Sequence, residues 1–152
     1  MKSKTVIVYA SAHHSNTRKL AEAIARHDDV ELVDVIANER YDLSGYDLIG
    51  VASGIVYGKY YPQMLKFLES NLPENKDVFF VHTAGDPRQK HAEGAKSIAQ
   101  RKNCRCLGVY YCKGFDTYGP FKIIGGINKS HPDEADINGA VRFYEGLRTN
   151  MG

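Results

Sequence analysis

The sequence has little that would tie the chain to a membrane, to nucleic acid or to an extracellular setting. No apolar run approaches the ~18–20 residues that a membrane-spanning helix needs. The apolar stretch 5–10 that follows the basic start is too short for the core of a signal peptide. The formal net charge is only +2 and the basic residues are scattered, which argues against nucleic-acid binding. We therefore expect a cytoplasmic protein without a membrane span and without a nucleic-acid partner.

Cysteine is scarce, and its placement suggests no disulfide framework. The three thiols are Cys104, Cys106 and Cys112. The spacing of Cys104 and Cys106 predicts one face of a strand, and it is not the spacing of a zinc site or a redox pair. Structural thiols of this kind fit a reducing compartment, which again favours the cytoplasm.

The common signatures of acid–base and metal chemistry are also absent. The sequence shows no catalytic triad, no clustered carboxylate pair and no metal-ligand spacing, so we predict neither catalytic residues nor a metal site. The histidines His82, His91 and His131 are scattered along the chain. We expect them at the surface or in loops.

What the sequence does contain is a regular alternation of strand-like and helix-like segments. Strands are expected at 6–10, 30–35, 46–52, 78–81 and 107–112, and helices at 17–27, 61–71, 89–102 and from 132 onward. Such alternation predicts parallel βαβ units with right-handed crossovers. The expected fold is an α/β, three-layer α/β/α sandwich: one domain over 1–152 with a five-stranded parallel sheet in the order 2-1-3-4-5. In that order ligands bind outside the carboxyl ends of the strands, where strands 1 and 3 diverge.

The loop that follows the first expected strand is suited to an anion. It reads Ser11-Ala12-His13-His14-Ser15-Asn16-Thr17 and leads into a helix, whose N-terminal N–H groups and partial positive charge favour a phosphate. It has neither the Gly-Lys-Ser/Thr of a P-loop nor a Gly-x-Gly-x-x-Gly turn, so a mononucleotide phosphate is indicated. The alternative is that Ser15 or Asn16 simply caps the helix.

The same loop resembles a known signature. The run Val8-Tyr9-Ala10-Ser11, with Asn16-Thr17 before Leu20-Ala21, is similar to the FMN-phosphate motif Ser/Thr-x-Thr-Gly-x-Thr of the flavodoxin family. Ser15 stands where that motif has glycine, and two histidines occupy positions that are often small or hydroxylated. The resemblance implies FMN as the cofactor, with its phosphate held by Ser11, His13, His14, Ser15, Asn16 and Thr17.

Two further loops resemble the flavin-ring loops of the same family. The segment from Ser53 to Lys59 is similar to the first of them, and its Tyr-Gly pair is closest to the protoporphyrinogen-oxidase-type flavodoxins. The alternative for Tyr57, and more so for Tyr60, is ordinary packing at the entry of the next helix. The loop after the fourth strand would offer its backbone to the pyrimidine edge of the ring. The ring contacts implied by the resemblance are Ser53, Gly54, Ile55, Tyr57, Gly58, Lys59, Thr83, Ala84 and Gly85.

One long segment, from Gly114 to His131, joins the last strand to the last helix. Long loops in compact domains are usually functional or disordered, and the aromatic and aliphatic residues of this segment make it too apolar for disorder. We interpret it as an ordered lid near the site. Short flavodoxins have no such segment at this position.

These expectations leave three functions open. The first is a flavodoxin-type redox protein that transfers electrons through FMN to a partner protein or a small acceptor. The second is an FMN-dependent oxidoreductase of the quinone or protoporphyrinogen type, with residues 114–131 as the substrate lid. The third is a binding module without redox chemistry. A monomer and a homodimer are both compatible with the sequence.

The charges near the expected ring also suggest a hypothesis. The loops expected near the ring carry three lysines, Lys59, Lys113 and Lys122, and two aspartates, Asp86 and Asp116. Because positive charge stabilises a nearby anion, the anionic reduced flavin should be less destabilised here than in an acidic carrier. A mildly basic carrier would also need partners other than the basic ones that suit an acidic carrier.

Overall fold

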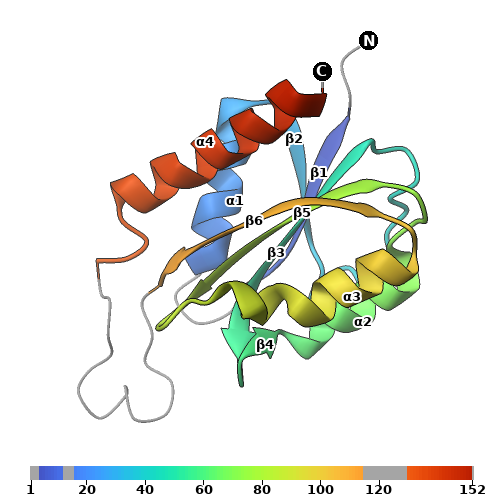
Figure 1. The fold of residues 1–152 in the computed structure, drawn as a ribbon, viewed down its shortest axis with the longest axis horizontal. Coiled ribbons are helices and arrows are strands. Elements are labelled where there is room, and N and C mark those ends of the chain that lie inside the picture. The colour runs from blue at the N-terminus through green and yellow to red at the C-terminus, as the bar shows by residue number, and fades with distance from the viewer. Residues whose placement is uncertain (1–3, 12–15, 115–129, 152) are drawn as a thin grey trace.

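The computed structural model describes residues 4–11, 16–114 and 130–151, and these form one mixed sheet with helices on both faces (Figure 1). The strands are β1 (Thr5–Ala10), β2 (Val30–Asp34), β3 (Leu48–Val56), β4 (Lys59–Tyr60), β5 (Asp77–Ala84) and β6 (Arg105–Lys113). The helices are α1 (Asn16–His27), α2 (Pro62–Asn71), α3 (Glu93–Arg101) and α4 (Glu134–Met151), and a 3-10 turn, η1 (Gln89–Ala92), precedes α3.

The sheet confirms the predicted fold class and order. The strands lie in the order β2-β1-β3-β5-β6, all paired in parallel, which is the predicted 2-1-3-4-5 arrangement of the five long strands. The short β4 was not predicted. It pairs antiparallel with the end of β3, so the sheet has six strands in the residues that the structure describes.

Strand alternation divides the core into two layers. Val6 and Val8 of β1 face the layer covered by α2 and α3, whereas Ile7 and Tyr9 face the layer of α1 and α4. All four are buried, as are most residues of the central strands. A strand buried on both faces needs apolar residues at every position, which explains the continuous apolar runs of β1, β3 and β5.

The ends of the helices follow local rules. Pro62 opens α2, where its missing N–H costs nothing because the first-turn donors have no helical partner. Asn103 follows α3 with a φ of 58°, the left-handed conformation that commonly ends a helix. No helix in the described ranges is both long and apolar enough to cross a membrane.

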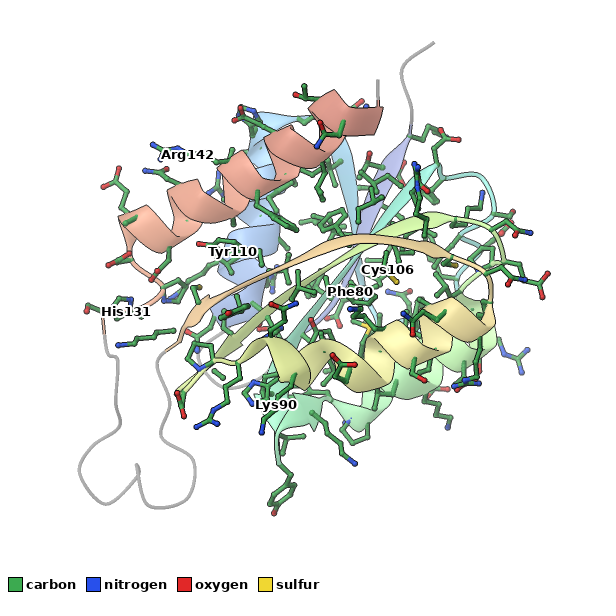
Figure 2. The ribbon with its side chains drawn as sticks, viewed as in Figure 1. Phe80, Lys90, Cys106, Tyr110, His131 and Arg142 are labelled. Atoms are coloured by element: carbon green, nitrogen blue, oxygen red, sulfur yellow. The ribbon has the colours of Figure 1, made fainter. Side chains whose placement is uncertain are left out.

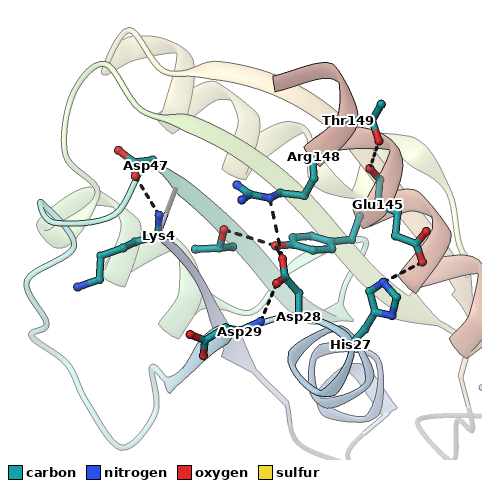
Figure 3. A network of polar contacts seen from close by, with 10 residues as sticks. Lys4, His27, Asp28, Asp29, Asp47, Glu145, Arg148 and Thr149 are labelled. Carbon is teal, nitrogen blue, oxygen red and sulfur yellow. Dashed lines mark hydrogen bonds and ion pairs between the residues drawn. The ribbon is translucent and has the colours of Figure 1, made fainter. Parts of the chain in front are cut away.

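Polar contacts join α1 to α4 at the end of the sheet away from the carboxyl ends of the strands (Figure 3). The Tyr144 hydroxyl donates to Asp28 at 2.8 Å, and Arg148 lies 4.0 Å from the same carboxylate. His27 and Glu145 form a further pair at 3.0 Å. These contacts hold the two helices together at the end of α1 opposite to Asn16 and Thr17, which makes Tyr144 a useful control position.

The largest departure from the predicted elements is at the end of β3. The sequence indicated a strand that stops at residue 52, but β3 continues to Val56 and turns back into β4. The turn residues Tyr57 and Gly58 have φ values of 52° and 73°, so both adopt the left-handed conformation of a two-residue hairpin turn. A tyrosine is uncommon at such a position, and the turn was therefore not recognised from the sequence.

Candidate functional site

The N-terminus of α1 lies at the carboxyl edge of the sheet, where β1 and β3 carry ligands in folds of this order. Asn16 and Thr17 form the start of the helix and are both buried, while Ser11 at the end of β1 is half-buried. The first turn of α1 carries no acidic residue. The positive end of its dipole is therefore not neutralised by a carboxylate of the helix's own first turn.

Two buried hydroxyls meet at this helix end. The Oγ1 atoms of Thr17 and Thr83 are 2.9 Å apart, which joins the start of α1 to the end of β5. Two hydroxyls carry two hydrogens, and their mutual bond uses only one of them. The other hydrogen is available to an acceptor such as a phosphate oxygen.

The end of β6 approaches the same point closely. An added Cβ at Gly114 would stand 2.7 Å from Asn16 Nδ2 and 3.1 Å from Thr83 Cβ. The Gly114 N–H also donates to the Ala84 carbonyl at 3.0 Å. Only a residue without a side chain fits here, so β6 helps to shape the edge where the phosphate loop begins.

The β3–β4 hairpin presents its turn outward. Tyr57 is 83% exposed, and Gly58 and Lys59 are exposed beside it. Only two residue pairs, Ile55–Tyr60 and Val56–Lys59, join the two arms. The predicted ring contacts Tyr57, Gly58 and Lys59 thus lie together on a small projecting turn.

Ser53 and Gly54, also predicted as ring contacts, lie inside β3. The Ser53 hydroxyl donates to the Gly54 carbonyl at 2.6 Å and accepts the Tyr61 N–H at 3.1 Å. Its side chain therefore fastens the start of α2 to β3. An added Cβ at Gly54 would stand 2.8 Å from the Tyr61 hydroxyl, which explains the glycine by close packing. Ile55 is half-buried nearer the turn.

The histidine at position 82 is not at the surface, contrary to the expectation from sequence. His82 has 0% exposure, and it follows Val78 and Phe80 at alternate positions on the α2/α3 face of β5. Burial lowers the pKa of His82 to about 4, although its bond to the Arg88 carbonyl opposes that shift. The period-two pattern of β5, extended by two residues, would have identified it as buried.

The side chains around His82 form a compact polar and aromatic cluster. Its Nδ1 lies 3.0 Å from the hydroxyl of buried Tyr60, and its Nε2 lies 2.8 Å from the Arg88 carbonyl oxygen. The Tyr111 ring stacks on the imidazole at 5.3 Å with an interplanar angle of 9°. His91, predicted as a surface residue, is half-buried with its ring 5.6 Å from that of His82. Sequence analysis did not assign a role to this cluster.

Part of the predicted site lies outside the described residues. This applies to His13, His14 and Ser15 of the phosphate loop, to residues 115–129 of the predicted lid, and to Asp116 and Lys122 of the charge hypothesis. Of the other phosphate-loop residues, Asn16 and Thr17 lie together with Thr83. Ala84 and Gly85 follow Thr83 at the edge and are half-buried.

A separate cluster forms the start of α4. The ligating atoms of His131, Asp133 and Asp136 lie within 4.8 Å of one another. Asp133 and Asp136 each accept the other's backbone N–H at 2.9 Å, and His131 Nδ1 is 2.6 Å from Asp136. Reciprocal bonds of this kind cap a helix, so capping accounts for the positions of these side chains.

The described edge fits a flavin mononucleotide in its chemistry. A helix end without acidic residues and a spare threonine hydrogen suit a phosphate, and an exposed tyrosine on a glycine-containing turn suits an aromatic ring. If FMN binds here, Thr17 would hold its phosphate end, and the hairpin turn would lie beside its ring. Thr83 was expected at the ring, but its bond to Thr17 brings its side chain to the start of α1, beside the phosphate end. Bound FMN supplies reversible electron uptake and release.

Comparison with known proteins places the chain in a family. A sequence model of the flavodoxin domain matches residues 6–111. An uncharacterised protein of Methanocaldococcus jannaschii is 39% identical over 150 residues, which cover 97% of this chain and 99% of that protein.

Solved structures share the fold at low sequence identity. Oxidised flavodoxin 1 from Bacillus cereus aligns with a TM-score of 0.70 at 16% identity, over 95% of this chain and 97% of that one. A flavoprotein in complex with FMN from Lactobacillus acidophilus aligns with a TM-score of 0.56 at 19% identity, over 72% and 93%. The predicted cofactor, FMN, is confirmed at the level of the family. The chain belongs to the flavodoxin family.

Proposed function

We propose that this protein is an electron carrier that binds FMN between the start of α1 and the β3–β4 hairpin. The observation that carries this proposal is the burial and hydrogen bonding of His82, at the carboxyl edge of the sheet. His82 is fully buried and has both ring nitrogens in hydrogen bonds, so neither nitrogen is open to exchange a proton with a substrate. Burial also raises the pKa of its partner Tyr60 well above the ordinary value, which keeps that hydroxyl neutral.

Electron transfer needs no acid or base from the protein, whereas most substrate chemistry does. In the described part of the edge, Lys59, Lys90 and Lys113 are exposed, and Asp86 is paired with Arg88 at 3.0 Å. Asp34 and Asp136 are half-buried and each accepts a backbone N–H. The residues that would surround the flavin are therefore suited to binding FMN and leaving it accessible to a redox partner, rather than to acid–base chemistry on a substrate. Three reduced thiols further support a cytoplasmic location as part of the proposal.

The direct test is the visible spectrum, followed by reduction. The purified protein reconstituted with FMN should absorb as a flavin, accept electrons from dithionite and pass them to an external haem protein. It should show no steady turnover with NAD(P)H and a quinone unless a reductase is added. Rapid turnover with those two substrates alone would support the oxidoreductase alternative, and failure to bind FMN would support a module without redox chemistry.

The charges near the proposed site favour an acidic partner surface. Lys59, Lys90 and Lys113 are exposed on β4, η1 and β6, and η1 contacts both of these strands. Of the acids close to these lysines, Asp86 is already paired with Arg88, and Glu93 is exposed at the start of α3. An electron-transfer partner with a negative docking face would be attracted to this edge, and salt would weaken that attraction.

Salt dependence and a matched pair of variants test the partner proposal. Electron transfer to acidic cytochrome b5 should slow as ionic strength rises, and transfer to basic cytochrome c should not. Lys90→Glu should slow transfer to cytochrome b5 about tenfold at low salt. Arg142→Glu makes the same charge change on α4, far from Lys90 (Figure 2), and should have little effect. The opposite salt trend would exclude an acidic partner.

A further inference from the structure

The cluster around His82 links two loops that are separate in sequence. Tyr60 is the last residue of the β3–β4 hairpin, and Arg88 lies in the loop between β5 and η1. His82 stands between them, 3.0 Å from the Tyr60 hydroxyl and 2.8 Å from the Arg88 carbonyl oxygen. A buried imidazole therefore bonds to both the hairpin and the 85–91 loop, in addition to the direct contact between β4 and η1.

The protonation state of this imidazole follows from its partners. A carbonyl oxygen only accepts hydrogen bonds, so Nε2 must carry a hydrogen and donate it to Arg88. In a neutral ring Nδ1 is then an acceptor, and it receives the Tyr60 hydroxyl hydrogen. Both ends of the chain Tyr60–His82–Arg88 are satisfied only when His82 is neutral and has this tautomer.

The Arg88 backbone is also held from its other side. Its N–H donates to His91 Nδ1 at 3.3 Å, and its carbonyl accepts the His91 N–H at 3.2 Å. The Arg88 side chain pairs with Asp86. The 85–91 loop is thus held at Arg88 by its own hydrogen bonds, and the bond from His82 to the Arg88 carbonyl helps to set the position of the loop relative to the hairpin.

The hairpin itself is short, although β4 also contacts η1 and α3. Two residue pairs join its arms, and its turn residues Tyr57 and Gly58 are exposed. A short two-stranded hairpin is marginally stable without further packing. Tyr60 is 1% exposed and its hydroxyl is bonded to His82, so this side chain is the anchor of the hairpin in the core.

We propose that Tyr60 and His82 are positioning residues that hold the β3–β4 hairpin and the 85–91 loop at the separation that FMN requires. This inference rests on the proposed function, because the hairpin contains predicted ring contacts and the 85–91 loop begins at another, Gly85. Neither residue needs to touch the flavin. Their effect is to pre-organise the site, so that FMN does not have to order the hairpin when it binds.

The same arrangement implies a dependence on pH. A proton on Nδ1 would reverse this hydrogen bond: Nδ1 would donate to the Tyr60 oxygen, the hydroxyl hydrogen would lose its acceptor, and a positive charge would be buried. The groups around the imidazole give such a charge little support: Tyr60 on β4 and Tyr111 on β6 are neutral, and His91 on η1 adds positive charge when protonated. The nearby ion pair between Arg88 and Asp86 is internally balanced and exposed. Protonation of His82 should therefore release the hairpin.

The experiment compares two buried tyrosines. Tyr60→Phe removes the hydroxyl bonded to His82, and Tyr144→Phe removes a hydroxyl bonded to Asp28 at the other end of the sheet. FMN dissociation constants are measured from the quenching of flavin fluorescence. Tyr60→Phe should weaken FMN binding about tenfold, because Nδ1 is left buried without its donor. Tyr144→Phe should leave it within about twofold of the wild type.

Amide hydrogen exchange of the FMN-free proteins provides a second readout. Exchange at Lys59 and Tyr60 should speed up in Tyr60→Phe and not in Tyr144→Phe, because only the first loses the anchor of the hairpin. His82→Gln keeps a donor for Arg88 but cannot be protonated. FMN affinity of the wild type should fall as the pH approaches about 4, and the affinity of this variant should fall less.

The outcomes separate the two proposals. A wild type that does not bind FMN contradicts the proposed function. Firm FMN binding that Tyr60→Phe and Tyr144→Phe affect equally contradicts only the positioning role. Equal acid sensitivity of the wild type and His82→Gln likewise contradicts that role, because the phosphate of FMN titrates identically in both proteins.

Discussion

Helices α1 and α4 differ in the charge of their first turns, and the difference suggests that one helix start serves ligand binding and the other serves stability. The first turn of α1 contains no acidic residue and has Thr17 bonded to Thr83. The first turn of α4 contains Glu134 and Asp136, and Asp133 precedes it. The dipole of α4 is thus neutralised by the chain's own carboxylates, whereas the first turn of α1 carries none and suits an anion from outside.

The difference in charge between the two helix starts supports a phosphate site at α1 independently of the sequence motif. A helix that needed only a cap would gain from an acidic residue in its first turn, as α4 does with Asp133 and Asp136. A helix that binds a phosphate loses affinity from the same residue. Exchanging the charges of the two helix starts therefore separates the two roles.

The largest effect is expected from Asn16→Asp, a nearly isosteric change that gives α1 the acidic start of α4. A carboxylate about 4 Å from a phosphate costs roughly 4 kcal/mol at an effective dielectric constant near 20, which is on the order of a thousandfold in affinity. Titration of FMN followed by flavin fluorescence measures this loss. In the FMN-free protein the new charge gains from the helix dipole but is largely buried, so the two effects oppose each other and the stability in urea should change much less than the FMN affinity. Unchanged FMN affinity would contradict the proposal that the phosphate binds at the start of α1.

Acid should affect the two regions in different pH ranges. Unfolded His82 takes up a proton near pH 6.5, but in the folded protein it does so only near pH 4. The free energy of unfolding should therefore fall as the pH decreases through this range, by up to about 3 kcal/mol. Urea unfolding at several pH values measures the slope, and His82→Gln should flatten it.

The cap of α4 responds at lower pH. The backbone N–H of Asp136 holds the pKa of Asp133 below its ordinary value of 3.8. Its stabilising contribution is present above that ordinary value and is lost as the pH falls through the lowered pKa. A loss of stability confined to this more acidic range, with none between pH 6.5 and 4, would contradict the assignment of His82 as buried and neutral.

Gly114→Ala tests the close approach of β6 to the start of α1. The new methyl group would stand 2.7 Å from Asn16 Nδ2, so Asn16 or Thr83 must move. Overpacking of this kind costs about 1–3 kcal/mol in stability, and FMN affinity should fall about tenfold because the phosphate end is displaced. Gly45→Ala is the control, because an added Cβ there meets nothing within 4 Å. Equal effects of the two changes would exclude a role for Gly114 in shaping the site.

The smallest effect is expected from Asp136→Asn at the start of α4. Loss of one capping carboxylate should lower the free energy of unfolding by about 1 kcal/mol, measured in urea at neutral pH. FMN affinity should remain unchanged, because this helix start carries its own neutralising charges. A clear drop in affinity would show that α4 contributes to the site and that the contrast between the two helices is incomplete.

The architecture was predictable from sequence because each long strand and helix has its own periodicity. Buried parallel strands such as β1 and β5 are continuous apolar runs, and α1 has a clear apolar face. The hairpin was not predictable, since its turn places Tyr57 at a φ of 52° that tyrosine rarely adopts. His82 was assigned to the surface because its residue type outweighed the alternation of β5.

The location of the candidate site could be predicted from the fold, whereas its contacts with FMN remain a prediction. The carboxyl edge follows from strand order, and the resemblance to flavodoxins directed attention to the loops after β1, β3 and β5. The exact contacts depend on packing that a sequence does not show. Ser53 was predicted as a ring contact, but its hydroxyl bonds to the Gly54 carbonyl and the Tyr61 N–H inside the protein.

The most direct test of the central claim is an amide NMR titration of the FMN-free protein with FMN and, separately, with inorganic phosphate. If the phosphate binds at the start of α1, the Asn16 and Thr17 amide signals should shift with both ligands, and those of Ala135 and Asp136 in α4 should not. The hairpin signals of Tyr57 and Gly58 should shift with FMN alone. Equal shifts at both helix starts, or none at Thr17, would contradict the account.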